Sequence, residues 1–279
     1  MPGFDLHSHT VHSDGLTTVA ANVAAAVAVG LDGLGVTDHD TTTHYDEAFA
    51  AAEGTGLEII AGTEFSSEHD SQSVHVLGLW VAADDVPLQA ELERLRNERY
   101  HRAVAIVEKF NGLGIELSFA RVAQLAADAP IGRPHIARAV VETGAAPDLQ
   151  TVFDEYLADG GPAYVPKHAV DPVTAVQLLT AAGGVAVIAH PALFGSRDQA
   201  GEGLPDDVIE AMAEAGMAGI EADHPDHNAA SRRKYRDMAK ALGLVVTAGS
   251  DFHGKTDEGG AIGSATTSNA AMDELRARR

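Results

Sequence analysis

The chain has 279 residues, and its 45% hydrophobic share is enough to build the core of one barrel-sized domain, with or without an insertion. It contains no cysteine, which excludes disulfides, iron–sulfur clusters and thiolate zinc sites and favours a cytoplasmic location. The formal net charge of −22 argues against extended binding to duplex nucleic acid, because such binding depends on neutralising phosphates.

The predicted elements alternate between short apolar strands and Ala-rich helices. The chain enters the first strand without a basic or long apolar leader and has no run of 18 apolar residues, so we expect neither a signal peptide nor a membrane span. Seven runs that are too short for ordinary helices, and are often flanked by glycine, are predicted as buried strands: residues 3–7, 33–38, 57–62, 74–79, 184–189, 219–222 and 244–249.

Helices are predicted between most of these strands, at residues 17–29, 46–52, 172–182, 206–215 and 229–242. Thr17 or Thr18 is a candidate N-cap of the first helix, and Gly30 is a candidate stop. Alternating strands and helices indicate a parallel sheet. Seven strands over this length favour a closed or nearly closed α/β barrel, and a doubly wound open sheet is the alternative.

Residues 97–165 interrupt this alternation, because no buried strand is predicted there. Short helices are expected instead at residues 99–110, 118–126, 133–142 and 149–157, separated by prolines and glycines. We therefore predict three segments: a first part of the barrel at 1–96, a helical insertion over the barrel mouth at 97–165, and a second part of the barrel at 166–279.

Side chains that can bind metal ions lie at or near the ends of the predicted strands. They are His7 and His9 at the first strand, Asp14 in the next loop, His39 after the second strand, Glu64 after the third, His75 in the fourth, His190 after the fifth, and Asp251 and His253 after the seventh. Strand ends of a parallel barrel face one side, which hosts the active site. Six imidazoles and three carboxylates are too many for one ion, and they suit two or three ions of Mn, Fe or Zn.

Each of these residues, taken alone, has a simpler interpretation. His7 and His9 alternate along a strand and can reach one metal, but most isolated pairs of this kind bind none. His75, inside an apolar strand, could be a hydrogen-bonded core histidine, and the Asp38-His39-Asp40 segment could be a polar loop. The placement of six of the 14 histidines at or near strand ends is what favours a metal site.

These motifs, in this order, resemble the PHP (polymerase and histidinol phosphatase) family. The motifs that carry the resemblance are His7-Ser8-His9 with Ser13-Asp14-Gly15, Thr37-Asp38-His39-Asp40, Gly62-Thr63-Glu64, Val74-His75-Val76-Leu77-Gly78, Ala189-His190-Pro191 and Gly249-Ser250-Asp251-Phe252-His253. The resemblance implies a distorted (βα)7, TIM-like barrel with a trinuclear metal site.

The resemblance also implies which residues hold each ion. The first ion would be held by His7, His9, Glu64 and Asp251; the second by Glu64, His75 and His190, with Glu64 bridging; and the third by Asp14, His39 and His253. Some relatives have histidine at the position of Asp14, and His12 lies close to it in the sequence. The third site is therefore the one that the resemblance defines least.

The predicted insertion is similar to that of one branch of the family. That branch includes nucleoside 3′,5′-bisphosphate phosphatases and 5′→3′ exoribonucleases that act on short RNA. The matching residues are Arg99 and Arg102, Gly132-Arg133-Pro134-His135, and Tyr164-Val165-Pro166-Lys167. The resemblance implies a small phosphorylated substrate, a nucleotide or short RNA.

We therefore expect a phosphoesterase that uses two or three divalent ions, with Mn favoured and Zn or Fe also suitable. Arg133 and His135 are expected to bind a second phosphate at a helix N-terminus, with Arg99 and Arg102 as further substrate contacts. The residues expected to act in catalysis are Glu64, His190, Asp251 and His227; His224 and His227 are the candidate substrate contacts and proton donors after the sixth strand.

Three alternatives remain at this point. A metal-dependent amidohydrolase would usually carry a carboxylated lysine at a strand end, and none of the predicted strand ends has one. A phosphatase of another small metabolite, such as histidinol phosphate, would use the same ligands. A non-catalytic metal-binding barrel would release no phosphate. The sequence does not indicate the oligomeric state.

Overall fold

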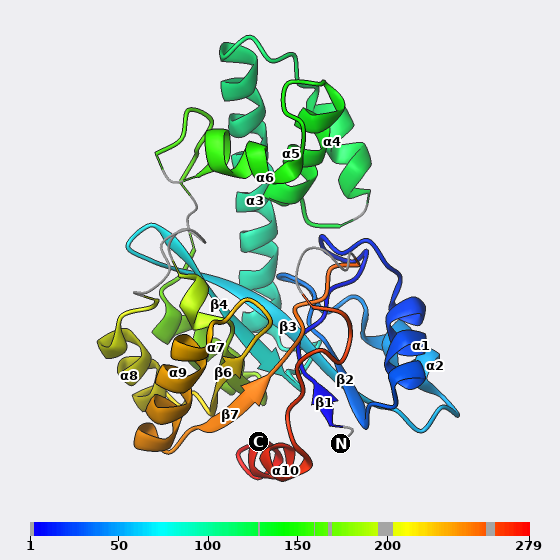
Figure 1. The fold of residues 1–279 in the computed structure, drawn as a ribbon, viewed down its shortest axis with the longest axis vertical. Helices are drawn as coiled ribbons and strands as arrows, with labels where there is room; N and C mark the ends of the chain where they lie inside the picture. Colours follow the sequence, from blue (N-terminus) through cyan, green and yellow to red (C-terminus); the bar gives the residue numbers. More distant parts are fainter. Residues whose placement is uncertain (1–2, 128, 159, 167–168, 195–202, 255–259) are drawn as a thin grey trace.

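The computed structural model describes residues 3–127, 129–158, 160–166, 169–194, 203–254 and 260–279. Within these residues, seven strands form one sheet whose order follows the chain (Figure 1). The strands are β1 (Phe4–Asp5), β2 (Gly33–Val36), β3 (Glu58–His69), β4 (Gln72–Leu79), β5 (Val185–Ile188), β6 (Gly219–Asp223) and β7 (Val245–Ala248). The predicted α/β barrel is confirmed.

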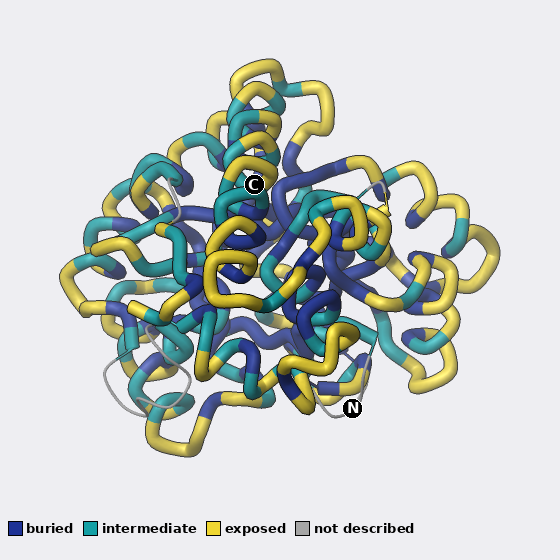
Figure 2. Tube along the Cα trace, turned by 90° about the horizontal axis from the view of Figure 1, so that it is seen from above, coloured by how far each residue is buried: buried dark blue, intermediate teal, exposed yellow. Residues whose placement is uncertain are grey.

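Hydrogen bonds just beyond β1 and β7 bring the two edges of the sheet together. The amide of Asp251 donates to the carbonyl of His7 at 2.9 Å, and the amide of His9 donates to the carbonyl of Phe252 at 2.9 Å. The sheet is therefore a nearly closed barrel. In Figure 2 the buried chain gathers at the centre of the molecule, and exposed segments surround it.

One strand runs against the predicted direction. β4 pairs antiparallel with both β3 and β5, whereas the other neighbouring strands pair in parallel. The expectation of a wholly parallel sheet was therefore wrong. Only Asp70 and Ser71 join β3 to β4, and both have positive φ, as in the two-residue turns that connect antiparallel strands. The reversal puts His75, near the start of β4, beside the carboxyl ends of the parallel strands.

Helices cover the outside of the barrel (Figure 1). They are α1 (Val19–Val29), α2 (Tyr45–Ala52), α7 (Pro172–Ala181), α8 (Asp206–Glu214), α9 (Ala229–Leu242) and α10 (Asn269–Arg276). The predicted ends of α1 are confirmed: the Thr18 side chain accepts a hydrogen bond from the Ala21 amide, and Gly30 ends the helix with φ 77°. Among the described residues, no helix is long and apolar enough to cross a membrane.

A second group of helices stands above the barrel (Figure 1). It contains α3 (Val86–Gly112), α4 (Phe119–Ala126), α5 (Arg133–Glu142), α6 (Leu149–Val152) and the π-helix η1 (Phe153–Leu157). α3 joins the two parts, because Leu92 and Leu95 pack in the barrel core while Ile106 and Phe110 pack in a separate helical core. The division of the chain at residues 97 and 165 stays a prediction.

Candidate metal centre

The candidate ligands converge at the edge of the barrel that faces the upper helices. Eight of the nine fall into three groups whose ligand atoms lie within 4.8 Å of one another. The groups are His7, His9, Glu64 and Asp251; His39, Glu64 and His75; and His9, Asp14, His39 and His253. The ninth residue, His190, places its Nε2 atom 3.0 Å from Oε1 of Glu64.

These groups resemble the arrangement expected from the sequence, with two differences. The first group has the same four residues. The second group contains His39 in place of His190, and the third contains His9 in addition to the expected residues. The structure thus brings all nine side chains together, and His9 and His39 each lie between two groups.

Glu64 lies at the centre of the cluster, with its two oxygens facing different neighbours. The contacts of Oε1 are His75 Nδ1 at 2.8 Å and His190 Nε2 at 3.0 Å; those of Oε2 are His9 Nε2 at 3.1 Å, His39 Nδ1 at 3.1 Å and His7 Nε2 at 3.3 Å. A carboxylate in this position can bridge two cations, one on each oxygen.

The electrostatics of the cluster show how strongly its carboxylates attract positive charge. Burial would raise the pKa of Glu64, but the surrounding imidazoles, when protonated, hold it well below its usual range. Burial would lower the pKa of His9, yet the nearby carboxylates of Asp251 and Glu64 raise it to about 10. Burial lowers the pKa of His39 to about 3, so that imidazole is neutral and has a lone pair to offer a metal.

The residues present fit divalent cations. Oδ1 of Asp251 and Nδ1 of His39 are buried and make no hydrogen bond to any described residue, as expected of atoms arranged to bind metal. Mixed imidazole and carboxylate ligands suit Mn, Fe or Zn. His190 and Asp251 have φ values of 28° and 51°, and such strained backbone at non-glycine residues is typical of functional sites.

Asp38 organises the loop that carries Asp14. Its buried carboxylate accepts hydrogen bonds from the Thr10 amide at 2.8 Å, the Thr10 hydroxyl at 2.7 Å and the Ser13 hydroxyl at 2.6 Å. His12 points elsewhere: its Nε2 atom lies 2.9 Å from Oε2 of Glu47, and it belongs to none of the three groups. Among these loop residues, Asp14 is therefore the one beside His39 and His253.

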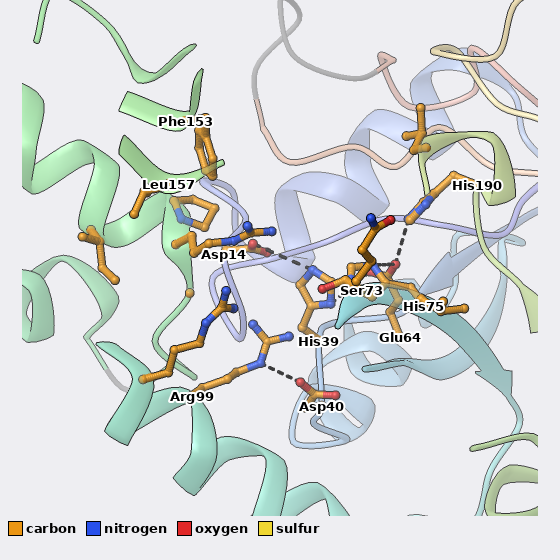
Figure 3. A pocket seen from close by; sticks show the side chains of 18 of the residues that line it. Asp14, His39, Asp40, Glu64, Ser73, His75, Arg99, Phe153, Leu157 and His190 are labelled. Atoms are coloured by element: carbon orange, nitrogen blue, oxygen red, sulfur yellow. Dashed lines mark hydrogen bonds and ion pairs between the residues drawn. The ribbon is translucent and has the colours of Figure 1, made fainter. Parts of the chain in front are cut away.

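A cavity of about 530 Å³ lies between the candidate metal-binding groups and the upper helices (Figure 3). Candidate ligands form its floor: Asp14, His39, Glu64, His75, His190, Asp251 and His253. Four arginines and several apolar side chains from the helices form the opposite wall: Arg99, Arg102, Arg133, Arg138, Ile106, Phe153 and Leu157. The helices also contribute Glu98 and Asp154 to the lining, but the four arginines outnumber these two carboxylates, so this wall carries a net positive charge although the chain is strongly acidic.

The predicted arginines lie on this wall, and two of them also make structural contacts. Arg99 donates from Nε to Oδ2 of Asp40 at 2.6 Å and from Nη2 to the hydroxyl of Ser66 at 2.7 Å (Figure 3 shows the first contact). Arg102 donates to the Val165 carbonyl at 2.8 Å. The guanidinium of Arg133 lies 5.9 Å from the ring centroid of Phe153.

Three predicted substrate contacts are not on the cavity surface. His135 is buried, and its Nδ1 accepts a hydrogen bond from the Gly132 amide, which caps α5. His224 and His227 are also buried: His224 Nε2 lies 3.5 Å from Asp251 Oδ2, and His227 Nδ1 lies 2.9 Å from the Ala222 carbonyl oxygen. Their positions give no support to direct contact with substrate. Lys167, another residue of the sequence match, lies outside the described residues.

Glu221 is a buried residue of the site that sequence reasoning did not single out. It lies in β6 with 0% exposure, and its carboxylate contacts His7 and the backbone of His190. The available signal was a carboxylate inside the predicted apolar run at residues 219–222.

The chain is similar to several known proteins. Residues 5–145 match the PHP domain. The chain is 35% identical over 265 residues to the 3′,5′-nucleoside bisphosphate phosphatase of Chromobacterium violaceum, covering 94% of this chain and 91% of that protein. It is 32% identical over 250 residues to a 5′-3′ exoribonuclease of Haemophilus influenzae, covering 90% and 89%. A crystal structure from Bifidobacterium adolescentis, assigned to the metal-dependent phosphoesterases, matches with a TM-score of 0.91 and 30% identity over 99% of this chain and 96% of that one.

Proposed function

The chain belongs to the PHP family of metal-dependent phosphoesterases, and we propose that it hydrolyses the 3′-phosphate of nucleoside 3′,5′-bisphosphates to give nucleoside 5′-monophosphates. The observation that carries this proposal is the cavity, where candidate metal ligands face four arginines. A molecule with two phosphates can place one on each side. The bisphosphate phosphatase of Chromobacterium violaceum, which aligns over nearly its whole length, supports the same substrate class.

We assign the three ions to the groups found in the structure, with Mn²⁺ as the expected metal. His7, His9, Glu64 and Asp251 would hold the first; Glu64, His75, His39 and His190 are available to the second; and Asp14, His39, His253 and His9 are available to the third. When bound, such ions polarise phosphoryl oxygens and make a nucleophilic water available near neutral pH.

The protein's own residues orient the substrate between floor and wall. Arg133 is the first residue of α5 and lines the cavity, so its guanidinium and the N-terminus of that helix can both attract the phosphate that is not cleaved. Arg99, fixed by Asp40 and Ser66, lines the cavity nearer the barrel. The 3′-phosphate is thereby placed against Glu64, His190 and Asp251, the residues that we assign to the reacting centre.

The same geometry fits trimming of short RNA from a 5′-phosphorylated end. The terminal 5′-phosphate would occupy the arginine wall, and the first phosphodiester, attached to the 3′-oxygen of the same nucleoside, would lie on the floor. The similarity to a 5′-3′ exoribonuclease of Haemophilus influenzae supports this second activity. An amidohydrolase of the usual type is disfavoured, because no lysine is found among the described residues that line the cavity.

Hydrolysis of a substrate panel by the Mn-loaded enzyme tests the proposal, with inorganic phosphate measured for the monoesters and nucleoside 5′-monophosphate measured for the dinucleotides. The panel contains nucleoside 3′,5′-bisphosphates, 5′-phosphorylated dinucleotides, histidinol phosphate and sugar phosphates. We expect the highest kcat/KM with the bisphosphates and measurable turnover of the dinucleotides. A preference for histidinol phosphate or a sugar phosphate would refute the substrate assignment, and no release from any substrate would refute the activity.

A further inference from the structure

A buried carboxylate contacts two candidate metal ligands without belonging to any of the three groups. Oε1 of Glu221 lies 3.1 Å from Nδ1 of His7, and Oε2 lies 2.8 Å from the backbone amide nitrogen of His190. Glu221 is fully buried in β6, the strand next to β5, which His190 follows. One side chain thus reaches two ligands that are far apart in the sequence, one after β1 and one after β5.

The contact with His7 determines which nitrogen of that imidazole can bind metal. Nε2 of His7 faces the first group, at 3.3 Å from both Glu64 Oε2 and Asp251 Oδ1. A cation bound there needs the Nε2 lone pair, so the proton of the neutral ring must be on Nδ1. Glu221 accepts a hydrogen bond from that nitrogen, which favours this tautomer.

The contact with His190 holds a strained backbone. His190 has φ 28° and ψ 54°, a conformation that non-glycine residues rarely adopt. Its amide donates to Oε2 of Glu221, while its Nε2 lies 3.0 Å from Oε1 of Glu64. The bond to Glu221 therefore fixes the backbone from which this imidazole reaches the cluster.

We propose that Glu221 is a positioning residue that keeps His7 in its metal-binding tautomer and holds His190 in its strained conformation. Its neighbour Gly249 provides the space for this arrangement: a Cβ atom there would lie 2.6 Å from Glu221 Oε1 and 2.3 Å from His7 Cβ. The inference rests on the metal assignment of the proposed function.

The carboxylate cannot be replaced by its amide without conflict. Both partners of Glu221 are donors, because the His190 amide can only donate and His7 must donate from Nδ1 when Nε2 binds metal. In Glu221→Gln, the amide oxygen can serve one partner, and the amide NH₂ then faces the other. Where it faces His7, it favours a proton on Nε2, which competes with the metal.

Metal affinity tests this role without depending on activity. Zn²⁺ affinity is measured by competition with a chromophoric chelator, and bound metal by elemental analysis, for the wild type, Glu221→Gln and the control Asp223→Asn. Asp223 is on the same strand, and its substitution removes the same charge. Its carboxylate pairs with Arg236 at 2.7 Å and not with a candidate metal ligand. We expect about 10- to 100-fold weaker binding of at least one ion in Glu221→Gln. We expect affinity close to the wild type in Asp223→Asn.

A second measurement uses the wild type alone, in case the variant does not fold. In the Zn-loaded protein, long-range ¹H–¹⁵N spectra report the tautomer of His7, assigned through its contacts with Gly249. A proton on Nδ1 supports the proposal, and a proton on Nε2 overturns it. Equal affinity of the wild type and Glu221→Gln, or an equal loss in Asp223→Asn, also overturns it. Failure of the wild type to bind divalent ions would instead refute the proposed function.

Discussion

Replacing Arg133 by alanine should impair hydrolysis of nucleoside 3′,5′-bisphosphates far more than hydrolysis of a simple aryl phosphate. Arg133 lies on the cavity wall formed by the upper helices, opposite the floor where the reacting phosphate would lie. A bisphosphate has a second phosphate for this wall, whereas an aryl phosphate has none. The substitution therefore removes a contact that only one of the two substrates makes.

The size of the effect follows from the kind of contact that is lost. A hydrogen bond to a charged group contributes roughly 1.5–3 kcal/mol, which corresponds to a decrease in kcat/KM of about 10- to 150-fold for the bisphosphate. A contact used only for binding would raise KM and leave kcat unchanged. We expect kcat to fall as well, because binding energy from the remote phosphate orients the reacting one.

The assay is steady-state kinetics of the wild type, Arg133→Ala and a control variant, with adenosine 3′,5′-bisphosphate and p-nitrophenyl phosphate as substrates. Arg121→Ala is the matched control: Arg121 is an exposed arginine of α4 that pairs with Glu142 at 2.7 Å and does not line the cavity. We expect it to affect neither substrate. Equal losses on both substrates in Arg133→Ala would mean that Arg133 supports the fold or the reacting phosphate, and the bisphosphate proposal would lose its main support.

The remaining predictions concern the cluster and its link to the helices. Glu64→Gln should abolish turnover and reduce bound metal, because the charge between two ion positions is lost. The far-UV circular dichroism spectrum should be retained. Wild-type activity at full metal content would rule out bridging by Glu64. Asp14→Ala should reduce activity less than His190→Ala at saturating Mn²⁺, and a metal titration that gives the reverse order would contradict the assignment of the third ion. Asp40→Asn should lower the free energy of unfolding by about 3 kcal/mol in urea titrations, since it leaves Arg99 without its partner carboxylate at 2.6 Å; a loss below about 0.5 kcal/mol would show that this pair adds little.

The sequence was sufficient for the barrel and for the residues of the cluster. Alternation of short β-branched runs with Ala-rich segments predicted all seven strands, and local capping by Thr18 and Gly30 predicted both ends of α1. The candidate ligands could be found because each follows or lies near a strand end in the chain. These are local signals, carried by residues a few positions apart.

The direction of β4 could not be predicted in this way. Periodicity reports which face of a strand is buried, but not whether its neighbour runs parallel or antiparallel. The positive φ values of Asp70 and Ser71, which make the tight turn between β3 and β4, are visible only in the structure. His75 consequently reaches the cluster from near the start of its strand.

The partners of individual side chains were decided only by the tertiary structure. Asp14 was the predicted ligand and His12 a histidine close to it in the sequence; in the structure His12 lies beside Glu47 and Asp14 lies beside His253. His135 matches a substrate-binding motif, yet it caps its own helix. Glu221 forms a hydrogen bond with His7, although the two residues are 214 positions apart in the sequence. Composition and spacing determine which chemical groups arrive at the barrel mouth, whereas which nitrogen or oxygen each one faces depends on packing between segments that the sequence keeps far apart.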